Sequence, residues 1–177
     1  TIAAMHSVAF NLDSLGRLHE AEQLLKETLS LKRRLYEPDD RSTFTTINML
    51  AATLTKLKKY DEAYPLALEA MKFREQTFGR DHPATLYTMV TIAGLYRHRG
   101  NLDEAEALTN DGLERTLRLF GPEHRVFSGF LRNKVMLLRQ RGKGDDATLL
   151  MNQYGFDDAK LGTVNAAATA PASQPAN

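Results

Sequence analysis

The sequence predicts an all-α protein, a solenoid of about four two-helix repeats. Two observations support this fold class: a three-residue segment recurs at a fixed spacing, and the apolar residues around it follow the period of a helix. The segment His19-Glu20-Ala21 returns three times, and each copy begins 42 residues after the last. A constant period of this length is typical of stacked supersecondary units that bury their apolar faces against neighbouring copies. The later copies are Asp61-Glu62-Ala63, Asp103-Glu104-Ala105 and Asp145-Asp146-Ala147.

The first helix of each repeat is expected over residues 2–15, 41–57, 83–99 and 125–141. Within these ranges apolar residues recur three and four positions apart, as one buried face of a helix requires. They include Val8, Ala9 and Leu12, then Leu50, Ala51 and Leu54, then Ile92, Ala93 and Tyr96. The turns that follow carry Gly16, Lys58, Gly100 and Gly142. Glycine accepts the left-handed backbone that ends a helix, so Lys58 must bear some strain or bend differently.

The second helix of each repeat opens with the acidic residues of the recurring segment, which suit the positive end of a helix dipole. The alanine that follows is small, as a close approach of two helices requires. The first three of these helices should run to about Tyr36, Phe78 and Phe120. In the fourth repeat Tyr154 and Gly155 shorten the helix, and we expect residues 156–161 to add a turn that covers the last apolar face.

These elements place one helical array in residues 1–161, with repeats of about 1–40, 41–82, 83–124 and 125–161. Residues 162–177 consist mainly of Ala, Thr, Pro, Ser, Gln and Asn. Such a composition cannot bury enough apolar surface to offset the entropy of ordering, so we expect a disordered tail. Because Thr1 aligns with Thr43 and Thr85, we also expect that the chain is cut from a longer parent protein.

The composition of the chain argues against several functional classes. The net charge of +1 argues against a bulk nucleic-acid or anionic-membrane binder. The absence of cysteine excludes disulfides and thiolate metal sites. No apolar run approaches the roughly 18–20 residues that span a bilayer, and the N-terminus lacks the layout of a secretory signal. We therefore expect a cytoplasmic protein.

Three segments resemble the tetratricopeptide (TPR) repeat, in the 42-residue form found in kinesin light chains. They are Gly79-Arg80-Asp81-His82-Pro83-Ala84-Thr85, Gly100-Asn101-Leu102-Asp103-Glu104-Ala105-Glu106 and Ala63-Tyr64-Pro65-Leu66. The resemblance covers about residues 1–154. It implies a right-handed superhelix without catalysis of its own, which holds peptides or partner domains in a concave groove.

The resemblance also implies that first helices line the groove, and the 42-residue period then identifies the contact positions. One row is His6, Asn48, Val90 and Arg132, and a second is Asp13, Thr55, Arg97 and Arg139, flanked by Ser14, Lys56, His98 and Gln140. A third row is Phe10, Ala52, Gly94 and Met136. Relatives repeat an asparagine along the first row to grip a peptide backbone. Only Asn48 keeps it here, so we expect a binding mode particular to this protein.

The C-terminal half of the predicted groove is basic, since residues 121–143 carry six Lys or Arg side chains against Glu123 alone, a net charge of +5. Arginine can bind carboxylates with two parallel hydrogen bonds, and a concave wall strengthens the field. One hypothesis is therefore an acidic peptide that docks against Arg97, Arg132 and Arg139. The other is a solvated helix face that keeps a terminal repeat soluble.

Other chemistry-bearing residues favour structural roles. His82 and His124 occupy equivalent linker positions, where packing and capping are expected. His98 lies in the groove row. One hypothesis is that it makes a pH-sensitive contact, and the other is that it is a plain polar lining of the groove. His6 and His19 lack a second ligand at helical spacing, which argues against zinc.

The sequence contains no motif that indicates a site for nucleotides or nucleic acids. Gly142-Lys143-Gly144 lacks the spacing and the preceding strand of a phosphate loop. Phe127 and Phe130 recur at core spacing rather than between the arginines, which argues against a nucleic-acid platform.

The sequence therefore predicts a non-enzymatic interaction module that needs no cofactor, metal or small-molecule substrate and that binds neither nucleic acid nor membrane. Its partner would be a peptide or a partner helix, acidic where it meets the basic half. One alternative is a regulatory or sensor segment of a larger signalling NTPase, or of a transport adaptor of the kinesin-light-chain type. Another is self-association through the apolar face around Ile2, Met5 and Ala9.

Overall fold

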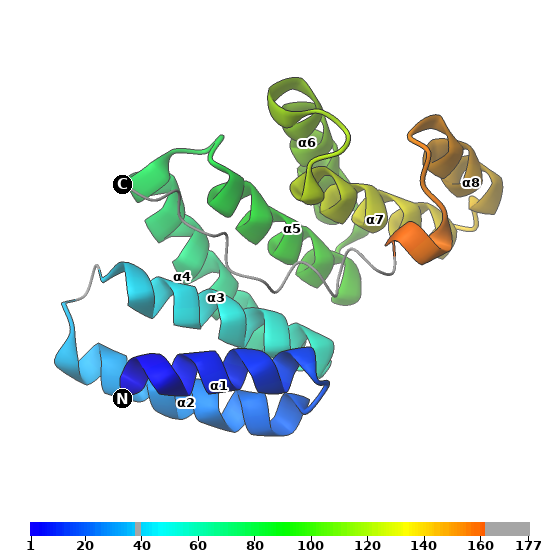
Figure 1. Cartoon of the computed structure of the whole chain (residues 1–177). Coiled ribbons are helices and arrows are strands. Elements are labelled where there is room, and N and C mark those ends of the chain that lie inside the picture. The colour runs from blue at the N-terminus through cyan, green and yellow to red at the C-terminus, as the bar shows by residue number, and fades with distance from the viewer. Residues whose placement is uncertain (38–39, 162–177) are drawn as a thin grey trace.

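The computed structural model describes residues 1–37 and 40–161, which form eight helices and no strand. The helices are α1 (Ile2–Ser14), α2 (Leu18–Leu35), α3 (Arg41–Lys56), α4 (Tyr60–Phe78), α5 (Pro83–His98), α6 (Leu102–Phe120), α7 (Arg125–Gln140) and α8 (Gly144–Gln153). A short helical turn follows at 158–161. Successive antiparallel pairs stack from α1–α2 at one end to α7–α8 at the other (Figure 1). The predicted all-α solenoid is thus confirmed, while the tail predicted at 162–177 lies outside the described residues.

The ends of the first helices follow the turn chemistry that the sequence predicts. Gly16, Gly100 and Gly142 all have positive φ, at 77°, 84° and 75°. Lys58 adopts the same conformation at φ 62°, and among the described residues no other non-glycine does so. Left-handed backbone costs an L-residue about 1–2 kcal/mol, so Lys58 carries the strain expected of it.

Side-chain caps fix where all four first helices begin. At α3 the Asp40 carboxylate accepts a hydrogen bond from the Thr43 backbone N–H at 2.8 Å. At α5 and α7 the imidazole Nδ1 atoms of His82 and His124 accept from backbone N–H groups at 3.1 and 3.3 Å. Both rings also stack on the phenylalanine that ends the preceding helix, with centroids 4.7 Å apart. The linker histidines therefore cap and pack, as the sequence predicts.

The core is continuous between repeats rather than confined to each of them. Ile47, Leu50 and Leu54 of α3 are buried in one cluster with residues from α1, α2, α4 and α5. The alanines that follow the acidic helix starts are fully buried: Ala21, Ala63, Ala105 and Ala147. Gly112 of α6 is also buried. It packs so closely on the Phe130 ring that a Cβ at this position would lie 2.2 Å from the ring. Small residues thus set the close approaches on which neighbouring repeats share stability.

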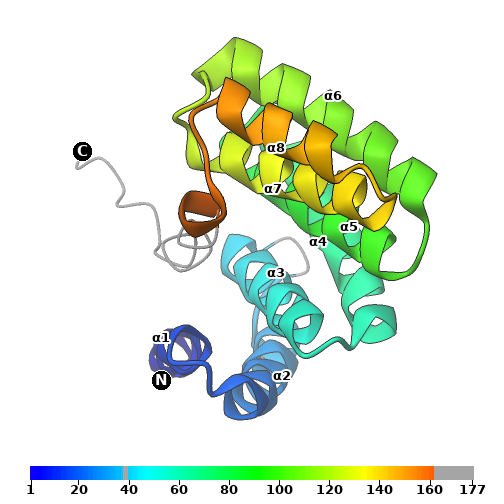
Figure 2. The same ribbon diagram turned by 90° about the vertical axis from the view of Figure 1, so that its right-hand side faces the viewer.

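The two ends of the stack differ. At the C-terminal end, Phe156 and Leu161 pack on Phe127, Ala147 and Met151, so the turn after α8 covers the last apolar face as predicted. This turn lies on the same side of the stack as α1 (Figure 2).

At the N-terminal end, Val8 of α1 and Leu15, the residue that follows α1, are 50% and 73% exposed. Ala9 is fully buried, so it does not belong to the apolar face predicted around Ile2, Met5 and Ala9.

Candidate functional site

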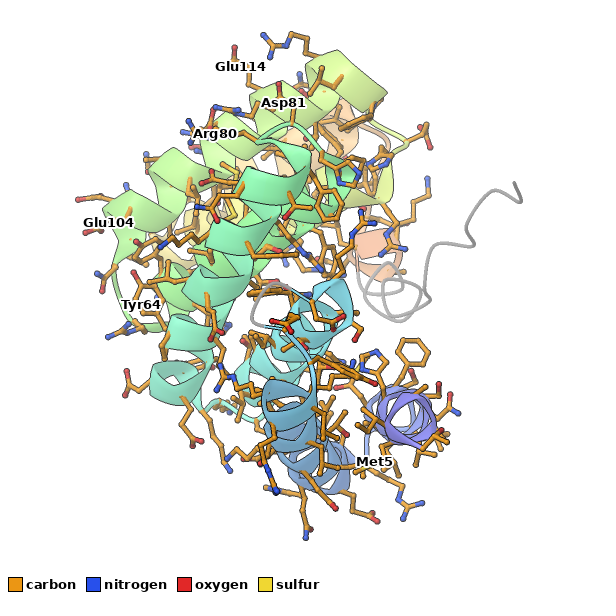
Figure 3. The ribbon with its side chains drawn as sticks, turned by 90° about the vertical axis from the view of Figure 1, so that its left-hand side faces the viewer. Met5, Tyr64, Arg80, Asp81, Glu104 and Glu114 are labelled. Carbon is orange, nitrogen blue, oxygen red and sulfur yellow. The ribbon has the colours of Figure 1, made fainter. Side chains whose placement is uncertain are left out.

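The packing brings the predicted contact rows side by side on consecutive first helices. Helix α1 contacts α3, α3 contacts α5, and α5 contacts α7. Figure 3 shows Glu104 and Glu114 on α6, whereas Met5 lies at the α1–α2 end. The first helices therefore share one row that side chains of several repeats can reach together.

In the N-terminal half, the first-row side chains bond to the next first helix. His6 Nδ1 lies 3.1 Å from Thr46 Oγ1, and Asn48 Oδ1 lies 3.2 Å from Thr88 Oγ1. Asn48, the one retained asparagine of the first row, is only 8% exposed. Its amide oxygen already has a partner inside the protein, the Thr88 hydroxyl. Burial lowers the pKa of His6, and the nearby Lys32 ammonium lowers it further.

The second row of the N-terminal half contains a buried ion pair. Asp13 of α1 is 6% exposed and pairs with Lys56 of α3. The Thr53 hydroxyl donates a second hydrogen bond to the same carboxylate at 2.8 Å. Thr55, the next member of the row, donates to the Ala51 carbonyl at 2.7 Å. The charges of Asp13 and Lys56 are thus paired within the protein.

In the C-terminal half, Arg97 is partly buried and lacks a carboxylate partner among the described residues. Its Nε is buried without a hydrogen bond, while an Nη atom lies 2.7 Å from His98 Nε2. The His98 ring stacks on Tyr60 with centroids 4.5 Å apart. Burial lowers the pKa of Arg97, and burial followed by the Arg97 charge lowers the pKa of His98. Both effects favour the neutral form of the His98 ring.

Arg132 of α7 resembles Arg97 in its surroundings. One Nη atom is buried with no hydrogen-bond partner in the described part of the chain, and burial lowers the pKa of the guanidinium. Its neighbour in the first row, Val90, packs against Gly129, whose Cβ would lie 3.1 Å away. The Asn133 side chain donates to the Val90 carbonyl at 2.9 Å. Helices α5 and α7 thus pack closely beside the Arg132 side chain.

The remaining predicted residues fall into two groups. Arg139 forms two hydrogen bonds, at 2.8 and 3.1 Å, to Asp158 in the turn after α8. It therefore holds that turn in place. Phe10 is half-buried and Met136 is exposed, so they offer apolar surface in the first and last repeats.

Part of the basic segment is neutralised by α6. Lys134 pairs with Glu106 at 2.6 Å, and Arg141 pairs with Asp103 at 2.6 Å and with Glu106 at 2.9 Å. The net charge of +5 counted along residues 121–143 is therefore not the charge of a free surface. What distinguishes this half is Arg97 and Arg132, which have no such partners.

Three polar residues near the rows were not among the predicted contacts. Lys32 of α2 donates to the Ser42 carbonyl at 2.7 Å, and Arg74 of α4 donates to the Ala84 carbonyl at 2.7 Å. These cations are one repeat apart, so the 42-residue period could have identified them. The third is Tyr87 of α5, over which the Arg125 guanidinium lies 5.6 Å from the ring centroid.

Across residues 1–37 and 40–161, no three His, Asp or Glu side chains gather as metal ligands. Within the same residues, no helix has the length and apolar character to span a membrane.

A family model of the tetratricopeptide repeat matches residues 1–63 and 42–118. A solved structure of a candidate kinesin light chain from Podosopora anserina, with nearly identical TPR-like repeats, has a TM-score of 0.72 at 19% identity, covering 86% of this chain and 72% of that one. BtubC (BKLC) from P. vanneervenii has a TM-score of 0.73 at 16% identity, covering 99% and 67%. At such identities the likeness establishes the fold. The comparison with curated proteins finds no match.

Proposed function

The chain belongs to the tetratricopeptide-repeat family, and from this premise we propose that it is a non-enzymatic scaffold that binds an extended peptide or a partner helix along α1, α3, α5 and α7. The ligand would be acidic where it meets α5 and α7. Proteins of this repeat class are in general protein-interaction scaffolds. The kinesin-light-chain-like neighbours are consistent with such a role.

The observation that carries the proposal is the contrast between unpaired and paired charges on the first helices. Arg97 Nε and one Arg132 Nη atom are buried without partners in the described part of the chain. A buried cation without a counter-charge is costly, and a carboxylate from a bound chain would relieve that cost while binding the guanidinium. The corresponding positions of the first two repeats are His6, Asp13, Asn48 and Thr55, and the carboxylate of Asp13 is paired with Lys56.

The test uses fluorescent peptide pools with two central glutamates and randomised flanks, compared with pools in which both glutamates are glutamine. We expect the full chain to prefer the glutamate pool and the variant Arg97→Glu/Arg132→Glu to lose that preference. Arg118→Glu is the matched control, because this exposed arginine lies on α6, away from both residues. Circular dichroism verifies that helicity is retained. Equal binding of both pools by the unmodified chain would refute the acidic preference.

The variant leaves Arg139 unchanged because of its bonds to Asp158. Replacing Arg139 would disturb the turn after α8 and confuse a loss of structure with a loss of binding.

A further inference from the structure

Arg97 and His98 make a contact at the end of α5 that fixes the protonation state of the histidine. The Nη2 atom of Arg97 lies 2.7 Å from His98 Nε2. A guanidinium group has N–H donors and no acceptor, so Nε2 must accept this hydrogen bond and carries no proton. The His98 ring is therefore neutral, with its proton on Nδ1, for as long as this contact exists.

The ring is held from its other side by α4. Tyr60 stacks on His98 with the two planes 11° apart and the centroids at 4.5 Å. Partial burial lowers the pKa of His98, and the positive charges of Arg97 and of Lys58, in the turn before α4, lower it further. The residue is nevertheless exposed, so protons from the solvent reach the ring.

The contact occupies half of the site at which an arginine binds a carboxylate side-on. The pair of Arg17 with Glu20 shows this geometry, since Nε and Nη2 of Arg17 each donate to one carboxylate oxygen at 2.6 Å. In Arg97 the Nε atom is buried and has no hydrogen-bond partner among the described residues, while Nη2 donates to His98. His98 thus takes one of the two donors that a carboxylate would take together.

The equivalent arginine one repeat later has a carboxylate partner. Arg139 donates to both carboxylate oxygens of Asp158, at 2.8 and 3.1 Å. The other repeats also lack a histidine at the position of His98, where they hold Ser14, Lys56 and Gln140. The combination of a histidine with an arginine that has no carboxylate is therefore found at one of these positions.

We propose that His98 is a positioning residue of the acidic-ligand site, which accepts from Arg97 in the free protein and takes up a proton when a ligand carboxylate replaces it. This inference rests on the proposed acidic-peptide function and names how one part of it is regulated. The carboxylate would accept from Nε and Nη2 of Arg97, which gives the buried Nε a partner. His98 would then bind a proton from the solvent at Nε2 and donate it in a hydrogen bond to the same carboxylate.

The exchange of partners gives binding a pH dependence of definite sign. In the free chain the charges that act on the His98 ring are positive and favour its neutral form, whereas a bound carboxylate favours the imidazolium. The pKa of His98 is therefore higher in the complex than in the free chain, and the affinity rises as the pH falls. Glutamate has an ordinary pKa of about 4.3, so the ligand keeps its charge at pH 6.0.

The contact is tested first, without a ligand. Nitrogen NMR of the full chain with labelled histidines distinguishes the two neutral forms of each ring, and at pH 7.5 we expect the proton of His98 on Nδ1. Arg97→Met removes the donor, so the fraction with a proton on Nε2 should increase and the pKa of His98 should rise. A proton on Nε2 in the unmodified chain would overturn the proposal.

Binding is tested next with the glutamate and glutamine pools at pH 7.5 and 6.0 and constant ionic strength. The unmodified chain should bind the glutamate pool about fivefold more tightly at pH 6.0, an effect that the titration of one histidine can supply. Its affinity for the glutamine pool should not change with pH. Circular dichroism at both pH values verifies that helicity is retained.

Two variants assign the pH dependence to one ring. His98→Phe keeps an aromatic ring that can stack on Tyr60, but this ring neither accepts from Arg97 nor titrates, so its affinity for the glutamate pool should be equal at both pH values. His19→Gln is the matched control, because the side chain of this α2 histidine is 82% exposed. It should keep the fivefold rise.

The outcomes separate the role of His98 from the proposed function. An equal rise in His98→Phe, or no rise in the unmodified chain, would overturn the role of His98. If the unmodified chain still preferred glutamate to glutamine at both pH values, the acidic-peptide function would stand without it. If no pool were preferred at either pH while the proton lay on Nδ1, the acidic-peptide function would be overturned, and the role of His98 in binding with it.

Discussion

The α1–α3 and α5–α7 junctions join equivalent helices by different means. At α1–α3, polar side chains connect the helices: Asp13 pairs with Lys56, and His6 contacts Thr46. At α5–α7 the backbones approach directly, since Val90 packs on Gly129 and Asn133 donates to the Val90 carbonyl. Helix α5 also contacts α7 more extensively than α1 contacts α3.

The difference shows how one repeat period can support two kinds of surface. At the α1–α3 junction, where polar side chains connect the first helices, the charges of Asp13 and Lys56 pair with each other. Where glycine lets the helices pack directly, the arginines beside the contact take no part in it. Arg97 and Arg132 thus have no ion pair among the described residues, and the α5–α7 junction depends on packed volume.

The largest expected effect concerns that packed volume. Phe130→Ala removes a fully buried ring that fills the space over Gly112, and we expect it to lower the free energy of unfolding by about 3–5 kcal/mol. Urea unfolding measures the loss, and hydrogen exchange locates it. Protection should fall first in α5, α6 and α7, with α1 changing least.

A second substitution separates close approach from general destabilisation. Gly112→Ala places a methyl group 2.2 Å from the Phe130 ring, so alone it should cost about 1–3 kcal/mol. Combined with Phe130→Ala it should cost much less, because the cavity accepts the methyl group. Additive losses would show that the two residues are not coupled and would remove the packing account of this half.

An intermediate effect is expected from the buried ion pair. Asp13→Asn leaves Lys56 without its carboxylate, and we expect a loss of about 1–2 kcal/mol, discounted because a third of the Lys56 side chain is exposed. Lys56→Met in the same background should recover part of the loss. Arg141→Gln breaks a pair with the almost fully exposed Asp103 and a pair with Glu106, which keeps Lys134 as a partner. This variant is the C-terminal control and should change little. If Asp13→Asn cost more than Phe130→Ala, the contrast between the two halves would fail.

The helices were predictable because their determinants are local. Apolar period and turn glycines fixed the first-helix ends to within one residue, and even the unusual backbone of Lys58 followed from its place among Gly16, Gly100 and Gly142. The predicted contact rows depend on the same period, which places equivalent residues on consecutive first helices.

Partner choice across repeats was not predictable. In the sequence, Lys134 and Arg141 count toward the charge of the basic segment, but they bind Glu106 and Asp103 of α6. Such pairings depend on distances between side chains far apart in sequence, which no local pattern encodes. Arg74 was missed for a related reason, since the resemblance directs attention to first helices and Arg74 reaches the row from a second helix.

The smallest expected effect is a pH dependence of the N-terminal junction. Burial and Lys32 lower the pKa of His6 below its ordinary value of 6.5, so the unfolded chain binds a proton more readily than the folded chain does. Stability should therefore fall as pH drops below about 6.5, and this contribution should be fully present above it. His98 and His124 shift in the same direction, so the measurement compares urea midpoints at pH 7.5 and 5.5 for the unmodified chain and for His6→Gln. The variant should lose less stability between pH 7.5 and pH 5.5. At pH 5.5, hydrogen exchange in α1 should be faster in the unmodified chain than in the variant. An identical decline in both proteins would mean that protonation of His6 does not weaken the α1–α3 junction.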